Sequence, residues 1–404
     1  MAKLKKYAMS LDDVYTVDEL EAELASRRLV GVTQLTLNGR NWGDTGANLL
    51  AASSQLATLR ILDLGENQIT DAGAQALASS PHLTHLRTLK LHRNQIGDAG
   101  AQALASSPYL SHLHELELHQ NRIGVAGARA LAGSRTLGNL TTLRLYRNQL
   151  GREGVEALLQ GNALASLHAL DIDHNEIGDG GAQAIGVATQ LSNLTSLNLT
   201  ANGIGPAGVA ALASAAPLQH LQHLDLSHNK LGPEGAEALA RSESLTHLAT
   251  LHLAHTELGA AGMVALAQSP ILRGIARLDL RSNAISDAGL AALAAAEHSG
   301  ALRALLLNDN DIGDEGAIAL AHTTGLVGLT LLYLAENQIG DFGAQALAEA
   351  PALANLTELD LWGNHVRAAG ATALAQSPYL TNLMLLDVGG GADEDDEDDE
   401  DEDE

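Results

Sequence analysis

The segment LRTLKLHRNQIGDAGAQALASSPYLSH, Leu86–His112, contains one complete copy of a unit that recurs along the chain. The unit reads LxxLxLxxNxIGDxGAxALAxSPxL and has a 27-residue period, which no insertion or deletion interrupts. Its asparagine stands at 67, 94, 121, 148, 175, 202, 229, 283, 310, 337 and 364, and Thr256 fills the one internal gap. Glycine follows the same spacing from residue 46 to residue 370. Self-similarity at a fixed period predicts a solenoid of stacked repeats.

Each copy of the unit predicts a short strand followed by a short helix. The LxLxx part alternates apolar and polar residues as a strand does, and the Ala- and Leu-rich part favours a helix. An aspartate such as Asp71 or Asp98 is interpreted as the N-cap of its own helix. We interpret Gly73 and its copies as the points where a helix approaches a strand closely. Prolines at 81, 108, 270, 351 and 378 end the helix and begin the return turn.

Strands that are joined through helices must run parallel. Neighbouring strands lie about 4.8 Å apart, whereas packed helices need about 10 Å, so the stack has to curve. The predicted fold is therefore an α/β solenoid, a right-handed β-α horseshoe with parallel strands on the concave face and helices on the convex face. Leu62, Leu64 and their copies are predicted to point into the stack. The asparagine column is predicted to have a structural role, because its amides can satisfy backbone groups in the loops.

The motif LxxLxLxxNxIGDxGAxALA resembles the leucine-rich repeat of the ribonuclease-inhibitor-like subfamily, in which every repeat contains a strand and a full helix. Its GAxALA part is similar to the GALA-type repeats of bacterial effectors. The resemblance covers about residues 30–391 and implies a leucine-rich-repeat fold. The family includes inhibitors, immune receptor domains, bacterial effectors and Ran-type GTPase-activating proteins, so the resemblance implies several different functions.

Three segments follow from the boundaries of the repeats. Residues 1–29 are predicted to form an N-terminal cap, because Thr16–Glu19 has the pattern of a capping box before a helix. Trp42 stands in the isoleucine column and is predicted to belong to the core of the first repeat. Residues 30–391 are predicted to form the leucine-rich-repeat domain and to end in a strand within Leu383–Val388. Residues 392–404 are predicted to be a disordered acidic tail.

Composition excludes several classes of protein. Aromatic residues make up 2% of the 404 residues, with a single Phe, so the core is predicted to consist of aliphatic layers. The chain has no cysteine, which excludes disulfides and thiolate metal sites. We find neither a signal-peptide pattern nor an apolar run of about 18 residues, and therefore expect a cytoplasmic protein that does not bind membranes. The net charge of −26 argues against nucleic acid as a partner.

The residues beside each leucine pair, at 61, 63 and 65 and at the equivalent positions of later repeats, are predicted to face the open concave side. Two zones of these columns are candidate contacts for a protein partner. The first is a basic zone, although its charges could instead only balance nearby carboxylates. The second is an apolar strip, which the C-terminal segment could also cover. Exposed Trp and Tyr favour an interface for the strip. The candidate residues are Lys90, Arg93, Arg144, Tyr146 and Arg147 in the basic zone and Leu306, Leu331, Tyr333, Trp362 and Leu385 in the apolar strip.

No metal or cofactor site is predicted. Four histidines, His223, His228, His252 and His255, fall on two adjacent predicted strands, and zinc accepts such ligands. No carboxylate spacing accompanies them, however. We also find no catalytic triad, catalytic cysteine or phosphate-binding loop.

The leading hypothesis is a monomeric, non-enzymatic scaffold that binds a protein partner on its concave face. The alternatives are a GTPase-activating protein of the Ran-activator type or an adaptor similar to bacterial effectors with leucine-rich repeats. Ran-type activators resemble this chain in their acidic tail and use an arginine on a loop of an early repeat. Only Arg40 lies near the corresponding place, and the early loops carry no extension. The acidic tail is also a candidate to bind the basic zone and block it.

Overall fold

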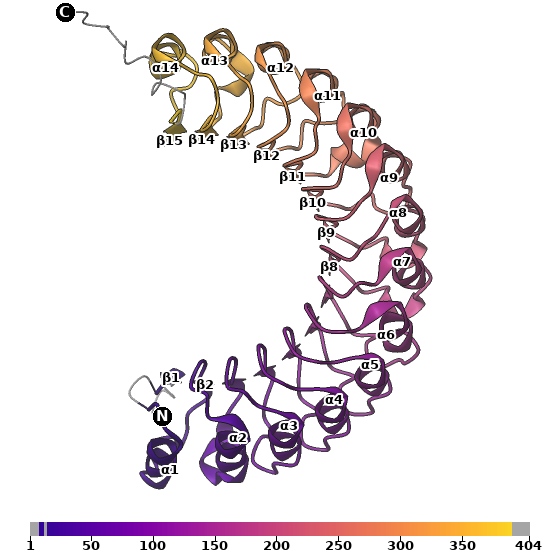
Figure 1. Ribbon diagram of the computed structural model, residues 1–404, viewed down its shortest axis with the longest axis vertical. Coiled ribbons are helices and arrows are strands. Elements are labelled where there is room, and N and C mark those ends of the chain that lie inside the picture. The colour runs from indigo at the N-terminus through magenta and orange to yellow at the C-terminus, as the bar shows by residue number, and fades with distance from the viewer. Residues whose placement is uncertain (1–7, 12–13, 390–404) are drawn as a thin grey trace, which may run out of the picture. The chain divides into compact units, whose positions relative to one another are not determined.

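The computed structural model describes residues 8–11 and 14–389 (Figure 1). The chain forms two compact units, divided after Asp225. The acidic tail predicted at residues 392–404 lies outside the described residues. No helix in the described part of the chain is long and apolar enough to cross a membrane.

In the first unit the described residues form nine strands and eight α-helices. Short 3-10 helices at Ser54–Thr58, Thr189–Leu191 and Ala216–Leu218 lie in the connections. The elements are β1 (Ala8–Ser10), α1 (Val17–Ala25), β2 (Gln34–Thr36), α2 (Gly43–Ala52), β3 (Ile61–Asp63), α3 (Asp71–Ala78), β4 (Thr88–Lys90), α4 (Asp98–Ala105), β5 (Glu115–Glu117), α5 (Val125–Ala132), β6 (Thr142–Arg144), α6 (Gly151–Leu158), β7 (Ala169–Asp171), α7 (Gly178–Gly186), β8 (Ser196–Asn198), α8 (Pro206–Ala213) and β9 (His223–Asp225).

The second unit continues the same alternation of helix and strand over its described residues. Its 3-10 helices are Pro270–Arg273 and Pro351–Leu353. The elements are α9 (Gly232–Ala240), β10 (Thr250–His252), α10 (Gly259–Ala267), β11 (Arg277–Asp279), α11 (Ser286–Ala294), β12 (Ala304–Leu306), α12 (Asp314–Ala321), β13 (Leu331–Tyr333), α13 (Asp341–Ala348), β14 (Glu358–Asp360), α14 (Ala368–Ala375) and β15 (Leu385–Asp387).

Within each unit every strand pairs in parallel with the next strand of the sequence. The register joins equivalent positions of consecutive repeats, so that Thr88 pairs with Glu115 and Glu115 with Thr142. The strands follow one edge of each unit and the helices the other (Figure 1). Leu62 and Leu64 are buried between these layers, as predicted. The α/β leucine-rich-repeat solenoid predicted from the 27-residue period is confirmed.

Buried asparagine amides connect neighbouring repeats in both units. Asn94 Oδ1 accepts hydrogen bonds from the backbone N–H groups of Asn67 and Ile69, at 3.0 and 2.9 Å. Its Nδ2 donates to the carbonyls of Leu64 and Leu91, both at 3.0 Å. One side chain thus satisfies four backbone groups in two repeats, which is the structural role predicted for this column.

Where a helix carries an aspartate in its first turn, as Asp71 and Asp98 show, this residue caps the helix of the next repeat, so the prediction that it caps its own helix is wrong. Asp71 is the first residue of α3, and its Oδ1 accepts hydrogen bonds from Gly97 N at 2.6 Å and Gly100 N at 2.9 Å. Those groups belong to the start of α4. The first turn of a helix has N–H groups without intrahelical partners, and here a carboxylate from the neighbouring helix supplies the acceptor.

This interhelix contact also explains the glycine column, for which the sequence predicts close approach of helix and strand. A Cβ atom at Gly100 would lie 2.7 Å from Asp71 Oδ1 and 3.1 Å from Ala74 Cβ, both on α3. The close approach is therefore between two helices. A side chain at this position would displace the carboxylate that caps the helix.

The N-terminal cap contains the predicted capping box and one strand that the sequence did not indicate. Thr16 Oγ1 accepts from Glu19 N, and Glu19 Oε2 accepts from Thr16 N. Trp42 is buried, as predicted, and its Nε1 donates to the Tyr15 carbonyl at 3.1 Å. Strand β1 pairs with β2 but is too short to show an alternating pattern.

Replacing Asn310 by Ala should lower the free energy of unfolding by about 3 kcal/mol or more, because it leaves buried backbone N–H groups without acceptors. Asn310 Oδ1 accepts from Asn283 N and Ile285 N, and the residue is fully buried. Urea denaturation followed by circular dichroism measures the change. The exposed Asn355→Ala is the control, since Asn355 donates one bond to the Val327 carbonyl, and should change stability by less than about 1 kcal/mol. Equal effects of the two substitutions would contradict this role.

Candidate functional site

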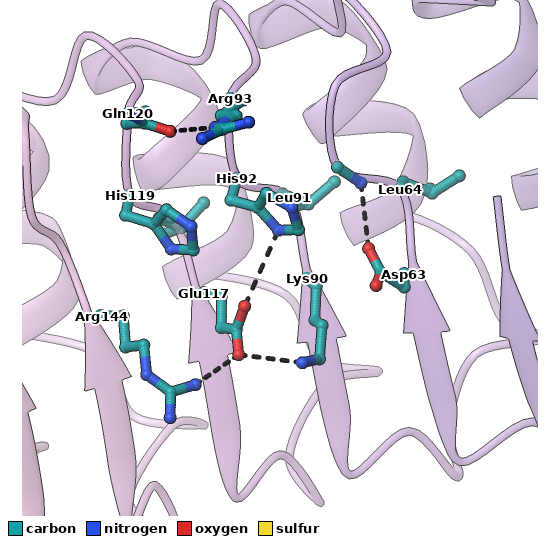
Figure 2. Close-up of polar contacts among 12 residues, drawn as sticks. Asp63, Leu64, Lys90, Leu91, His92, Arg93, Glu117, His119, Gln120 and Arg144 are labelled. Carbon is teal, nitrogen blue, oxygen red and sulfur yellow. Dashed lines mark hydrogen bonds and ion pairs between the residues drawn. The ribbon is translucent and has the colours of Figure 1, made fainter. Parts of the chain in front are cut away.

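A compact polar cluster lies on the strand side of the first unit, over β4, β5 and β6 (Figure 2). The register places Lys90, Glu117 and Arg144 side by side at the ends of these strands. Two residues further on, His92, His119 and Tyr146 form a second row. The geometry follows from the repeat itself, because equivalent positions of consecutive repeats lie on adjacent strands.

Glu117 is the centre of this cluster. The residue is 5% exposed, and its Oε1 contacts Lys90 Nζ at 3.1 Å and also Arg144 Nη1. Oε2 faces His92 Nδ1 at 3.7 Å (Figure 2). Burial by itself would raise the pKa of Glu117, but Lys90 and Arg144 hold that pKa below its ordinary value. The carboxylate is therefore ionised at neutral pH despite its burial.

The second row forms a stack of three rings. The His92 and His119 ring centroids lie 4.7 Å apart with 7° between their planes, and His119 and Tyr146 lie 4.0 Å apart at 15°. Burial lowers the pKa of His119 to about 4, and His92 contributes in the same direction. In the described part of the chain, the buried Nδ1 atoms of His92 and His119 have no hydrogen-bond partner.

His92, Glu117 and His119, hereafter the His–Glu cluster, could hold a metal ion. Their ligand atoms lie within 4.8 Å of one another, and this is the only group of three such residues within residues 8–11 and 14–389. Of the histidines considered from the sequence, His228 and His255 do stack, at 4.4 Å. The sequence analysis did not identify the His–Glu cluster. The sequence does indicate it, because two histidines occupy equivalent positions of consecutive repeats and a glutamate stands two residues before the second.

The predicted basic zone is an ion-pair network with carboxylates of the same chain. Lys90 and Arg144 contact Glu117, and Arg144 also lies 2.7 Å from Glu115 Oε1. Arg93 lies 2.7 Å from Glu66 Oε1. Tyr146 is half-buried against His119, and Arg147 is exposed. The charge of this zone is therefore largely balanced locally, which is one of the two interpretations that the sequence left open.

Asp171, at the end of β7, is the neighbour of Arg144 in the register. Burial raises the pKa of Asp171 to about 6, and the charge of Asp173 adds to this shift. The hydrogen bond from Asp173 N to Asp171 Oδ1, at 3.3 Å, and the Arg144 charge act in the opposite direction but do not offset it. This acid therefore titrates closer to neutrality than an ordinary carboxyl group.

The predicted apolar strip in the second unit is only partly exposed. Trp362 and Leu385 are 47% and 49% exposed, and Leu331 and Tyr333 are half-buried. The prediction that Leu306 faces solvent is wrong, because this residue is 4% exposed. Its partners in the register, Asp279 and Tyr333, flank it closely on the neighbouring strands.

Carboxylates also interrupt the predicted apolar strip. Glu358 lies between Leu331 and Leu385 in the register, and its Oε2 accepts a hydrogen bond from the Tyr333 hydroxyl at 2.7 Å. Met384, directly before β15, is 83% exposed and was not among the predicted contacts. The surface is thus a set of separate apolar side chains around acidic groups.

Arg40, the arginine relevant to GTPase activation, is held against the N-terminal cap. Its Nη2 donates to the Leu11 carbonyl at 3.1 Å, and its guanidinium carbon lies 4.9 Å from the centroid of the Tyr15 ring. Both contacts tie the side chain to the segment that precedes the repeats.

A family model described as "Leucine Rich repeat" matches twelve segments of the chain, which together cover more than half of it: residues 55–78, 82–105, 109–132, 139–159, 163–186, 190–213, 218–240, 244–267, 276–294, 302–321, 329–348 and 352–375. The chain belongs to the leucine-rich repeat family. Among solved structures, this leucine-rich repeat protein is similar to an internalin (inlF) from Listeria monocytogenes, with a TM-score of 0.47 and 20% sequence identity over 93% of this chain and 84% of the internalin chain. No curated protein matches the sequence.

The substitution Asp171→Asn should raise the free energy of unfolding relative to the wild type, and this gain should be larger at pH 7.5 than at pH 4. The folded-state pKa of Asp171 is about 6, above its ordinary value of 3.8, so the folded state binds this proton more tightly than the unfolded state. In the wild type, the contribution of Asp171 to the free energy of unfolding is fully present below about pH 4 and is lost as the pH rises through 6. Thermal unfolding at the two pH values measures the difference. Asp311→Asn, at an exposed position, controls for the loss of one carboxylate, and a pH-independent effect of Asp171→Asn would refute the assignment.

Proposed function

We propose that this protein is a non-enzymatic scaffold that binds a protein partner through its strand face. Leucine-rich repeats are typical of protein–protein interaction, and the family membership supports this class of function. The observation that carries the proposal is the exposure of Trp362 and Leu385 in the second unit, at 47% and 49%; Trp362 directly follows β14 and Leu385 begins β15. Side chains that are exposed to this extent contribute little to the packing of the repeats, whereas Trp is enriched among residues that dominate binding energy.

The surroundings of Trp362 indicate the chemistry of the partner. Asp360 accepts a hydrogen bond from Trp362 N at 3.0 Å, and Glu358 binds the Tyr333 hydroxyl. An apolar anchor surrounded by carboxylates suits a partner that presents an apolar side chain flanked by basic residues, because complementary charge adds specificity and speeds association. Leu331 and Leu385 extend the apolar contact on either side of Glu358.

The basic zone of the first unit is the second proposed contact. Arg93 and Arg147 are exposed, and both occupy left-handed backbone positions, with φ of 51° and 52°. Lys90 and Arg144 pair with the buried Glu117, so we assign to them support of the surface. Arg93 pairs with Glu66, but both of these side chains are exposed, so we assign contact with the partner to Arg93 together with Arg147 and Tyr146.

Three narrower assignments belong to the same proposal. We place the chain in the ribonuclease-inhibitor-like subfamily, on the basis of its 27-residue period and its full helix in each repeat. We also propose that it acts in the cytoplasm and as a monomer.

The combined substitution Tyr333→Ala and Trp362→Ala should weaken binding of a protein partner by about 2 kcal/mol or more, roughly 30-fold in Kd, because it removes the exposed anchor and its neighbour. Partners captured by the wild-type protein are to be purified, and the Kd of each is measured by isothermal titration calorimetry against wild type and variant.

Phe342→Ala is the matched control. Phe342 is 75% exposed in the same unit but lies on α13, on the helix side. It should change the Kd by less than about 3-fold. A partner that loses affinity with Phe342→Ala, and not with the strand-face variant, would refute binding through the strand face.

A further inference from the structure

We propose that the His–Glu cluster binds one Zn²⁺ ion, with His92, Glu117 and His119 as its protein ligands. Two imidazole nitrogens and one carboxylate oxygen form a ligand set that zinc accepts, and three protein ligands leave one tetrahedral position for water. The site lies on the strand face of the first unit (Figure 2), and it does not depend on the protein-binding proposal.

The distances in the cluster are close to those that zinc requires. Bonds of about 2.0–2.2 Å in a tetrahedron place ligand atoms about 3.3–3.6 Å apart. His92 Nδ1 and Glu117 Oε2 already lie 3.7 Å apart, and all three ligand atoms lie within 4.8 Å of one another. The histidine rings are nearly parallel, so one ring has to turn about its Cβ–Cγ bond before both nitrogens can point at the same ion. Closure around the ion therefore requires a side-chain rotation within the ring stack.

The buried nitrogens of the histidines are the second observation that points to a ligand. The Nδ1 atoms of His92 and His119 are buried and lack hydrogen-bond partners in the described part of the chain. A buried polar atom without a partner costs about 1–3 kcal/mol. His119 is 6% exposed, so water at the surface does not serve as a ready substitute. Coordination of a metal ion would use these lone pairs.

The cations around Glu117 do not occupy the oxygen that the metal needs. Lys90 and Arg144 contact Oε1, whereas Oε2 is directed at His92. The two cations hold the carboxylate in place and keep it ionised, as partners outside the coordination shell do in metal sites. They also repel a bound cation, so we expect weaker binding than in a closed site with four protein ligands.

The second unit contains a natural comparison. His228 and His255 stack at 4.4 Å and 15°, much as His92 and His119 do. Among the described residues, however, they do not belong to a group of three potential ligands. The two pairs differ in two respects: only the first has the carboxylate of Glu117 beside it, and His228 and His255 are exposed, whereas His119 is buried.

The test uses the full chain, freed of metal with a chelator and titrated with ZnCl₂ in isothermal titration calorimetry and with CoCl₂ in visible absorption. Excess Mg²⁺ occupies the acidic tail, whose carboxylates prefer hard cations. We expect one equivalent of Zn²⁺, and Co²⁺ bands of a site with nitrogen and oxygen ligands. His92→Ala with His119→Ala should lose the bands and weaken Zn²⁺ binding by more than about 10-fold, since even outer-shell changes cost about 10- to 100-fold.

His228→Ala with His255→Ala is the matched control and should bind Zn²⁺ like the wild type. Glu117→Gln keeps the shape of the side chain and should also weaken binding, and circular dichroism shows that each variant is folded. No saturable Zn²⁺ binding by the wild type would overturn the proposal. So would binding that the His92 and His119 substitutions leave unchanged, or that the His228 and His255 substitutions remove.

Discussion

Buried asparagine amides bond to backbone groups of two consecutive repeats, and the rest of the structure depends on that constraint. Asn94 accepts from the loop of the preceding repeat and donates to carbonyls of both repeats. Such a bond network tolerates only one register, because a shift by one residue would leave buried N–H and C=O groups without partners. On the helix side, Asp71 adds a second connection of the same kind by capping the next helix.

The fixed register turns each position of the repeat into a row of side chains across adjacent strands. Rows on the strand face lie outside the layer of leucines between strands and helices, so their residue types are free to vary from repeat to repeat. In the first unit this freedom places Glu117 between Lys90 and Arg144 and stacks His92 on His119. In the second unit it places Trp362 and Leu385 on the surface around Glu358. The two surfaces have the same backbone geometry and different chemistry.

The corrections share one cause, which is that contacts between repeats cannot be read within one repeat. The DxGA pattern correctly indicated the start of a helix, but Asp71 caps the following helix. Gly100 has no side chain there, and this leaves room for the Asp71 carboxylate. Leu306 stands in a column that faces away from the core, yet its neighbours on adjacent strands bury it. The sequence likewise showed Lys90, Arg93 and Arg144 as a basic zone, whereas acids of neighbouring repeats balance them.

The sequence by itself determined the length of the repeat, the order of strand and helix, the core leucines and the rows in which every surface residue lies. An uninterrupted 27-residue period permits only one alignment of parallel strands, and this alignment follows from the pattern alone. Only the tertiary structure decided which side chains of a row contact one another, which oxygen of Glu117 faces His92, and which apolar side chains are exposed to solvent. Those outcomes depend on rotamers and on shielding by neighbouring strands, and both arise only when several repeats are packed together.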